Sequence, residues 1–416
     1  MSSKSDRIMK RWQEQRWLLD TVIRTVGMEW DQGRLAYMGA PGGGEAVMEM
    51  RMVGARVKKA ADIDREFVKA AKRRQARAQA YEAEGRMIAA GENYFIAMLL
   101  WASARWPIFE ASDWLIELEE NMNHCYEKYI PHAAHPIEIV KIPMTCLDGV
   151  TRSMPAYLHL PRKPEPGEQF PCILSIDGMD ACKENMVAMY GDVMLNRGFA
   201  VLAYDGPGQG ECCTIPVQVT ATNHGDAAKA AFEFVDNHEH IDSNNICVKG
   251  VSFGTYFGTH AAAALGDRIK GTAVTGVCQE PGCNTIFNMA SPSFKLRFMF
   301  MSGYDDEDQF DEFIKGFDLR TIAGDITAPY MVIAGEDDQL SPIEHTHELF
   351  THIKAPKKLV VYEGANHGLN EGSSVALGEN RNTLMADWFA DRFAGNTMES
   401  ESVFIDAVGR ATSEGF

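Results

Sequence analysis

The stretch Ile246-Cys-Val-Lys-Gly-Val-Ser-Phe-Gly254 decides the fold of this chain. It begins with the β-branched run Ile246–Lys249, turns sharply around Ser252, and leads into the small-residue run Thr255–Leu265. A serine in a tight turn between a strand and a helix needs glycine two residues before and after it, because no room remains there for side chains. The turn exposes the serine oxygen above the sheet, and the helix points its N-terminus at negative charge that develops there. The stretch therefore predicts a nucleophilic serine on a strand–turn–helix unit.

Short apolar runs on both sides of this stretch predict a large sheet. Helical stretches such as Glu184–Asn196, Asp226–Asn237 and Ile343–Ile353 separate several of the runs, and Asp148-Gly149 predicts a hairpin between the first two. Strands that alternate with helices indicate an α/β fold with a mostly parallel, doubly wound sheet that is covered on both faces. We expect eight strands: Ile137–Ile142, Ala156–Leu160, Cys172–Ile176, Ala200–Tyr204, Ile246–Lys249, Thr272–Val277, Tyr330–Ala334 and Leu359–Tyr362.

The sequence divides into three parts by pattern. Residues 1–135 have helical periodicity and contain six of the seven tryptophans, so we expect a helical domain that covers the substrate site. The apolar run Tyr94–Phe109 is interrupted by Arg105 and is too short for a membrane span, which predicts a buried helix. Residues 136–396 are the expected catalytic domain, and residues 397–416 form a C-terminal tail with no strong secondary-structure signal.

Charge and cysteine content restrict the partners and the compartment. The chain has 40 Lys and Arg against 58 Asp and Glu, a formal charge of −18, which disfavours nucleic acid and anionic bilayers as partners. The basic run Lys69–Arg77 is interpreted as a solvated helix face. Nine cysteines without a CxxC pair, and a polar stretch from Met1 to Glu14, predict reduced thiols in a cytoplasmic protein. We expect a small-molecule substrate, no nucleic acid and no membrane, and leave open whether a homodimer forms.

An acid and a base follow two of the later strands. Asp338 comes just after the run Tyr330–Ala334 and precedes a proline-led helix, and His367 lies on a glycine-flanked loop after the run Leu359–Tyr362. The order Ser252, Asp338, His367 is one of the orders in which a Ser-His-Asp triad occurs. Two other carboxylates compete for the acid position: Asp337, and Glu280, which follows another strand and could instead contact the substrate.

The loop after the run Cys172–Ile176 is the expected second half of an oxyanion hole. The backbone N–H groups of Phe253 and Met179 are the expected donors. The glycine-rich loop Asp205–Glu211 lacks the spacing and the lysine of a nucleotide-binding loop, so it predicts a turn beside the site. The pairs His238/His240 and His345/His347 have no third ligand at a convincing spacing. We therefore expect no cofactor and no metal.

With these residues in place the chain resembles the α/β-hydrolases. More narrowly it resembles the group of 2,6-dihydroxypseudooxynicotine hydrolase and the fungal polyketide-shortening hydrolases. The matching stretches are Asp177–Glu184, Arg197–Ala200, Ala203–Glu211, Gly250–Gly254, Asn366-His367 and Met385–Trp388. The resemblance implies a helical N-terminal domain over the active site and metal-free hydrolysis of a carbon–carbon bond next to a ketone, in an aromatic or polyketide-like substrate. Asp177 departs from the histidine that many members have before the glycine, which concerns the substrate more than the catalysis.

Two other functions remain open on the sequence. A triad and an oxyanion hole suffice for a carboxylesterase that acts on a bulky ester. A ligand-binding protein that kept the fold and lost the chemistry is the alternative from another class, although a binding protein has no need of all three triad residues.

Overall fold

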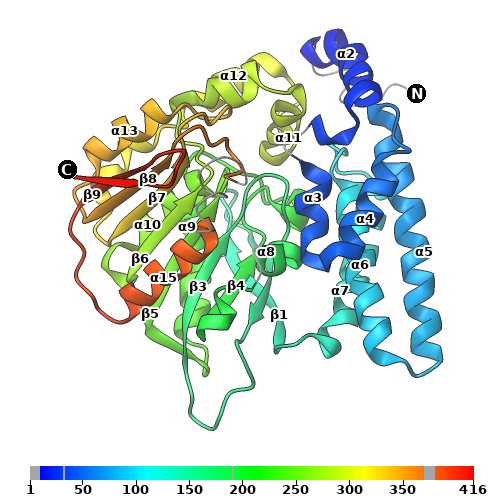
Figure 1. Ribbon diagram of the computed structural model, residues 1–416, viewed down its shortest axis with the longest axis horizontal. Coiled ribbons are helices and arrows are strands. Elements are labelled where there is room, and N and C mark those ends of the chain that lie inside the picture. Colours follow the sequence, from blue (N-terminus) through cyan, green and yellow to red (C-terminus); the bar gives the residue numbers. More distant parts are fainter. Residues whose placement is uncertain (1–9, 31–32, 190–191, 370–379) are drawn as a thin grey trace. The chain divides into compact units, whose positions relative to one another are not determined.

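The structure is a computed structural model that describes residues 10–30, 33–189, 192–369 and 380–416 (Figure 1). The chain forms two compact units: residues 1–137 together with 184–192, and residues 138–183 together with 193–416. The first boundary lies two residues beyond the expected one at 135. Residues 184–192, which we assigned to the catalytic domain, instead group with the helical unit.

The first unit is helical (Figure 1). Its longer helices are α2 (Lys10–Val26), α3 (Arg34–Gly39), α4 (Gly43–Gly54), α5 (Ile63–Ala83), α6 (Met87–Arg105) and α7 (Asp113–Tyr129). The helix α8 (Lys183–Met189) begins at the junction between the two units.

Helix α6 is the core of the helical unit. It is long and apolar enough to cross a membrane by length and composition alone, but 72% of its most apolar window is buried within the structure, as in the core helix of a globular domain. Its polar groups have partners: the Tyr94 hydroxyl donates to Glu82 (2.6 Å), and Arg105 lies 3.5 Å from the buried Glu119. The run Tyr94–Phe109 is thus a largely buried helix as far as Arg105, as its composition predicts.

The basic run on α5 is only partly a solvated face. Lys69 is exposed and pairs with Glu66, whereas Arg74 is largely buried and donates to Glu45 and Glu49 of α4. Arg74 therefore joins two helices of the unit, and part of the basic character of the run is neutralised within the fold.

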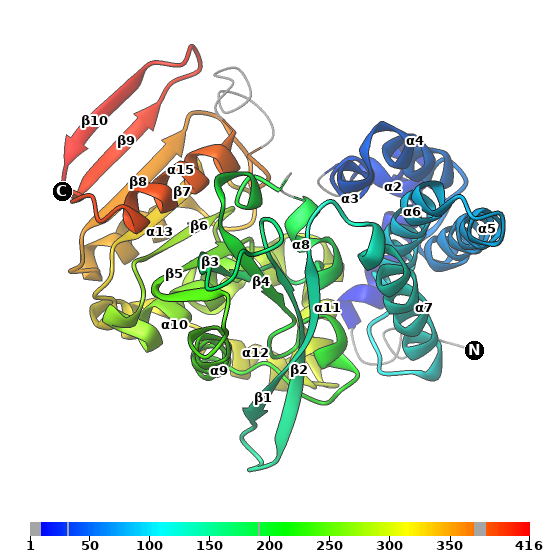
Figure 2. The same cartoon turned by 90° about the horizontal axis from the view of Figure 1, so that it is seen from below.

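The second unit is a twisted sheet with helices against it (Figure 2). The strand order is β1-β2-β4-β3-β5-β6-β7-β8-β9-β10. The seven strands β4, β3, β5, β6, β7, β8 and β9, neighbours in this order, run parallel. At the two ends of this set, β2 pairs antiparallel with β4 and β10 pairs antiparallel with β9. The main helices of this unit are α9 (His224–Asp236), α10 (Gly254–Leu265), α11 (Pro292–Ser302), α12 (Glu307–Ile314), α13 (Ile343–His352) and α15 (Arg381–Phe393).

All eight expected strands are present within the described residues. They are β1 (Ile137–Thr145), β2 (Thr151–His159), β3 (Phe170–Ile176), β4 (Ala200–Tyr204), β5 (Ile241–Val251), β6 (Gly271–Thr275), β7 (Tyr330–Gly335) and β8 (Lys357–Tyr362). The central strands β4, β6 and β7 are buried along their whole length, which explains their continuous apolar sequence.

The last residues correct our expectation of a tail. Strands β9 (Glu401–Ile405) and β10 (Ala411–Gly415) extend the sheet beyond the eight expected strands, with β9 paired to β8. Every residue of β10 is exposed, and only Ile405 of β9 is buried. Such edge strands need no apolar pattern, which is why composition alone does not indicate them.

Candidate active site

Ser252 lies in the sharp turn between β5 and α10. Its φ is 57°, in the left-handed region that side chains rarely adopt. A Cβ on Gly250 would stand 2.3 Å from the carbonyl oxygen of Gly254, and a Cβ on Gly254 would stand 2.5 Å from that of Ile176. Both glycines are therefore required by close backbone approach, as the sequence pattern predicts.

Ser252, His367 and Asp338 form a continuous hydrogen-bonded chain. Ser252 Oγ lies 3.0 Å from His367 Nε2, and His367 Nδ1 lies 2.9 Å from Asp338 Oδ2. His367 and Asp338 are 4% and 5% exposed, so the interaction between them is little screened by water. Because the carboxylate accepts the proton on Nδ1, Nε2 is left to accept the serine proton.

Of the three carboxylates weighed as the acid, Asp338 is the one that hydrogen-bonds with His367. Its Oδ1 also accepts the N–H groups of Leu340 (2.9 Å) and Ser341 (3.1 Å). Asp337 is exposed. Glu280 accepts the N–H of Thr285 (2.7 Å) at the start of a short π-helix and lies 3.9 Å from His345 Nε2.

The two expected oxyanion donors come from two different loops: Phe253 directly follows the serine, and Met179 follows β3. Phe253 is the N-cap of α10, and Met179 is buried in the loop after β3. Gly178 touches the serine: a Cβ added to it would stand 2.9 Å from Cβ of Ser252. Among the described residues, the N–H groups of Phe253 and Met179 donate to no backbone or side-chain acceptor, whereas the Gly178 N–H is bound by Asp177 Oδ1 (2.9 Å).

Two residues near Ser252 and His367, Gln339 and Cys278, are not predicted from the sequence. Gln339 accepts the His367 N–H with its side-chain oxygen (3.1 Å), which holds the histidine loop. The thiol of Cys278 lies beside Ser252 and Asp338, where burial and the Asp338 charge raise its pKa well above the usual range. The thiol therefore stays protonated, and a protonated thiol is a poor nucleophile. Neither residue belongs to a recognisable motif, so no local signal indicates them.

A buried lysine lies in β5, three residues before Ser252. Lys249 of β5 donates to Ser175 Oγ of β3 (3.2 Å) and is 3% exposed. Burial lowers the pKa of Lys249 to about 8, although the carboxylate of Asp177 opposes the shift. The positive charge of Lys249 thus partly compensates the buried Asp177.

Aromatic side chains pack behind Phe253. Its ring lies 4.5 Å from that of Phe298 on α11 and 5.2 Å from that of Phe257. Phe298, Met299 and Met301 are almost fully buried. These side chains are therefore core that supports the residue after the serine.

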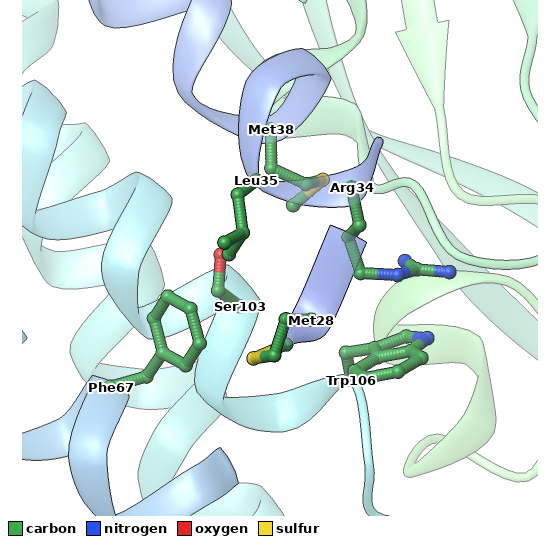
Figure 3. Close-up of a pocket in the computed structure, with 7 residues that line it drawn as sticks. All are labelled: Met28, Arg34, Leu35, Met38, Phe67, Ser103 and Trp106. Atoms are coloured by element: carbon green, nitrogen blue, oxygen red, sulfur yellow. The ribbon is translucent and has the colours of Figure 1, made fainter. Parts of the chain in front are cut away.

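No metal-binding cluster stands out. Within the described residues, no group of three His, Cys, Asp or Glu side chains could hold a metal ion, and none of the nine cysteines forms a disulfide. A separate small cavity lies inside the helical unit (Figure 3), where the guanidinium of Arg34 stacks 4.0 Å above the ring of Trp106. Its other lining residues are Met28, Leu35, Met38, Phe67 and Ser103.

Sequence comparison places the chain among hydrolases. The model of the prolyl oligopeptidase family matches residues 190–396. The chain is 24% identical over 321 residues to 2,6-dihydropseudooxynicotine hydrolase of Paenarthrobacter nicotinovorans, a match that covers 76% of this chain and 82% of that protein. It is 28% identical over 153 residues to hydrolase ORFZ of Pyricularia oryzae, which covers 35% of each chain.

Structural comparison gives the same fold. The crystal structure of 2,6-dihydroxy-pseudo-oxynicotine hydrolase superimposes with a TM-score of 0.71 at 23% identity, covering 88% of this chain and 99% of that one. The aligned part of this chain is longer than the second unit alone, so it includes residues of both units. The comparison establishes the fold.

Proposed function

We propose that this chain, which belongs to the α/β-hydrolase family, is a serine hydrolase in which Ser252 is the nucleophile, His367 the base and Asp338 the acid. The observation that carries the proposal is the hydrogen-bonded chain Ser252–His367–Asp338 on a strained, glycine-flanked turn. A serine is a weak nucleophile until a base takes its proton, and this arrangement places the base nitrogen 3.0 Å from the oxygen.

The reaction would proceed in two halves. Ser252 Oγ attacks the substrate carbonyl as its proton moves to His367 Nε2, and Asp338 stabilises the resulting imidazolium through Nδ1–H. The carbonyl oxygen becomes an oxyanion that the N–H groups of Phe253 and Met179 stabilise. His367 then gives the proton to the leaving group, whose departure leaves the acyl-enzyme. A water molecule activated by His367 then attacks the acyl carbonyl, the bond to Ser252 Oγ breaks, and the acyl group leaves as a carboxylic acid.

The favoured substrate is a ketone with an aromatic or enolisable leaving group. Support comes from the resemblance to a group that cleaves carbon–carbon bonds next to ketones. A carbanion leaves far less readily than an alkoxide, so such cleavage requires a proton delivered to carbon or a pocket that stabilises an enol. Glu280 is the candidate donor from the second unit, although its hydrogen bond to the Thr285 N–H also fits a structural role.

We further propose that the helical unit shapes the substrate site. Pockets form preferentially where two domains meet, and the helical unit exposes large apolar side chains such as Trp17 and Ile88, at 68% and 77%. A truncated chain that starts at Pro136 is expected to be insoluble or to lose selectivity for bulky substrates. A soluble truncation with unchanged kcat/KM would contradict this role.

A fluorophosphonate probe tests the proposed chemistry directly. The intact chain is expected to be labelled at Ser252, as located by mass spectrometry of the digested protein. Ser252→Ala removes the labelled atom and His367→Ala removes the base, so both variants should remain unlabelled and lose about 10⁴ to 10⁶ in kcat, with the double variant little worse than either. An unlabelled wild-type chain would favour the non-catalytic ligand-binding protein.

A further inference from the structure

The loop Asp205–Glu211 is tightly built around two of its own side chains. It follows β4 and ends in a short 3₁₀ turn at Gly210–Cys213. A Cβ on Gly210 would stand 2.0 Å from Asp205 Oδ2, and a Cβ on Gly206 would stand 3.0 Å from Gln209 Oε1. The glycines thus leave space for the Asp205 carboxylate and the Gln209 amide.

The Gln209 amide joins this loop to the loop after β3. Gln209 is 1% exposed; its Oε1 accepts the N–H of Gly206 (3.2 Å), and its Nε2 donates to the carbonyl oxygens of Asp177 and Gly178, the latter at 3.1 Å. The carbonyl of Gly178 and the N–H of Met179 belong to one planar trans peptide and point in opposite directions. A hydrogen bond to that carbonyl therefore fixes the direction of the Met179 N–H.

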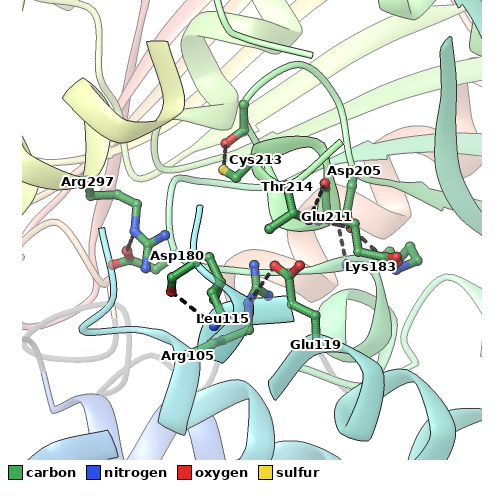
Figure 4. Close-up of polar contacts among 12 residues, drawn as sticks. Arg105, Leu115, Glu119, Asp180, Lys183, Asp205, Glu211, Cys213, Thr214 and Arg297 are labelled. Atoms are coloured by element: carbon green, nitrogen blue, oxygen red, sulfur yellow. Dashed lines mark hydrogen bonds and ion pairs between the residues drawn. The ribbon is translucent and has the colours of Figure 1, made fainter. Parts of the chain in front are cut away.

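The two ends of the loop that carries Gln209, Asp205 and Glu211, both interact with Lys183. The carboxylate of Asp205 accepts the backbone N–H groups of Lys183 (3.0 Å) and Glu211 (3.2 Å). The Lys183 ammonium, 3% exposed, lies 3.4 Å from Asp205 Oδ2 and also pairs with Glu211 (Figure 4). With its carboxylate occupied in this way, Asp205 fixes the start of the loop.

We infer that Gln209 is a positioning residue that orients the Met179 N–H in the oxyanion hole. The inference rests on the proposed function, since it concerns the same site. Because an oxyanion exists only in the transition state and the intermediate, loss of this orientation should lower kcat and leave KM nearly unchanged. Loss of a whole donor costs on the order of 10²- to 10³-fold, so misorientation of one donor should cost about 10- to 100-fold.

The test uses two variants of Gln209 in the full chain. Gln209→Glu keeps an acceptor for the Gly206 N–H but places an oxygen against two carbonyl oxygens, whereas Gln209→Met keeps the length without any donor. We expect kcat for a p-nitrophenyl ester to fall about 10- to 100-fold, more in Gln209→Glu, with KM within about threefold. The rate of fluorophosphonate inactivation should fall in parallel, because the phosphonyl oxygen occupies the same hole.

The control is Gln169→Glu. Gln169 is exposed and its Nε2 also donates to a backbone carbonyl, that of Glu239 (3.4 Å), but it lies just before the start of β3, whereas Asp177 and Gly178 follow the end of that strand. This variant should behave as wild type, and the melting temperature of each variant separates misfolding from misorientation. A loss confined to KM, or a kcat within threefold of wild type in folded Gln209→Met, would overturn the inference alone. An unlabelled wild-type Ser252 would overturn the proposed function and the inference with it.

Discussion

Gly178 lies directly against Ser252: a Cβ added to Gly178 would stand 2.9 Å from Cβ and 3.2 Å from Oγ of the serine. Cβ atoms essentially never approach another atom to less than 3.0 Å, so either the serine or the loop after β3 must move to admit a methyl group. The loop carries the Met179 N–H, and the serine forms the hydrogen bond to His367. Both sides of this contact thus belong to the proposed machinery.

Gly178→Ala is expected to lower kcat by at least 100-fold, because a displacement of about 1 Å at the reacting atoms costs that much. The free energy of unfolding should change little, since the contact involves one methyl group in the loops beyond the carboxyl ends of β3 and β5. Steady-state kinetics and urea unfolding measure the two effects. Gly324→Ala, at a position where a Cβ meets nothing within 4 Å, is the control. Equal activity in the two variants would show that the contact is unimportant.

Asp338→Asn is expected to lower kcat by about 10⁴, because an amide in place of the carboxylate favours the wrong histidine tautomer. Glu280→Gln makes the same chemical change at the competing carboxylate and preserves an oxygen for the Thr285 N–H, so it should cost less than about 10-fold on an ester. If Glu280→Gln is the more damaging of the two, the acid has been assigned wrongly.

The buried histidines predict acid sensitivity. Burial lowers the pKa of His224 to about 3, although its hydrogen bond to the Pro207 carbonyl (2.9 Å) opposes the shift, and burial lowers that of His260 to about 4. Between the ordinary pKa near 6.5 and these values, the unfolded chain binds protons that the folded chain does not. The free energy of unfolding should therefore fall as the pH falls below about 6.5, by up to about 1.4 kcal/mol per pH unit for each histidine.

His224→Gln retains a donor for the Pro207 carbonyl and removes one of the two proton sites. Denaturant unfolding between pH 6.5 and 4.5 should then show a slope against pH that is reduced by about 1 kcal/mol per unit. His260→Gln should reduce it independently, and the double variant should show the sum. A slope that neither substitution changes would mean that other groups control the acid sensitivity.

Parts of this fold follow from local pattern and parts do not. The strand β7 has an apolar sequence because all of its residues are buried. The turn around Ser252 is recognisable from the sequence because close backbone contacts, such as that of Gly250 with Gly254, leave room only for glycine. Strand β9 is not predicted because only one of its five residues, Ile405, is buried, so the strand has no apolar pattern. The role of Gln209 is not predicted for another reason: its partners, Asp177 and Gly178, are about thirty residues away, and the pairing of β3 with β4 brings them close to it.

Strand β9 should contribute to stability, although the sequence pattern predicts only a C-terminal tail at residues 397–416. It pairs with β8 along five residues, and the N–H of Glu363 donates to the carbonyl of Ile405 (2.9 Å). Removal of residues 397–416 leaves β8 as an unprotected edge, so the melting temperature should fall by about 5 °C or more and aggregation should increase. Removal of residues 406–416, which include the exposed β10, should cost about 2 °C or less. Equal melting temperatures for the two truncations would show that β9 adds nothing.

The last prediction concerns the bond that is broken. The triad and the oxyanion hole are sufficient for an ester, because an alkoxide departs readily once His367 protonates it. A carbon leaving group must depart as an enol or an electron-rich ring that accepts the proton on carbon, which requires more of the pocket than an ester does. Ester turnover alone therefore does not distinguish the two reactions.

The distinguishing measurement is kcat/KM for an aryl 1,3-diketone and for an ester of the same acyl group. Because both substrates form the same acyl-enzyme at Ser252, deacylation is common to them, and the comparison reports acylation: binding, addition to the carbonyl and departure of the leaving group. We expect the diketone to be turned over at a rate comparable to or above that of the ester. A preference for the ester by more than about 100-fold, roughly 2.7 kcal/mol of transition-state stabilisation, would replace carbon–carbon hydrolysis by carboxylesterase activity. In that case Glu280→Gln should leave both rates unchanged, whereas a proton donor to carbon at Glu280 requires that the substitution slow the diketone and spare the ester.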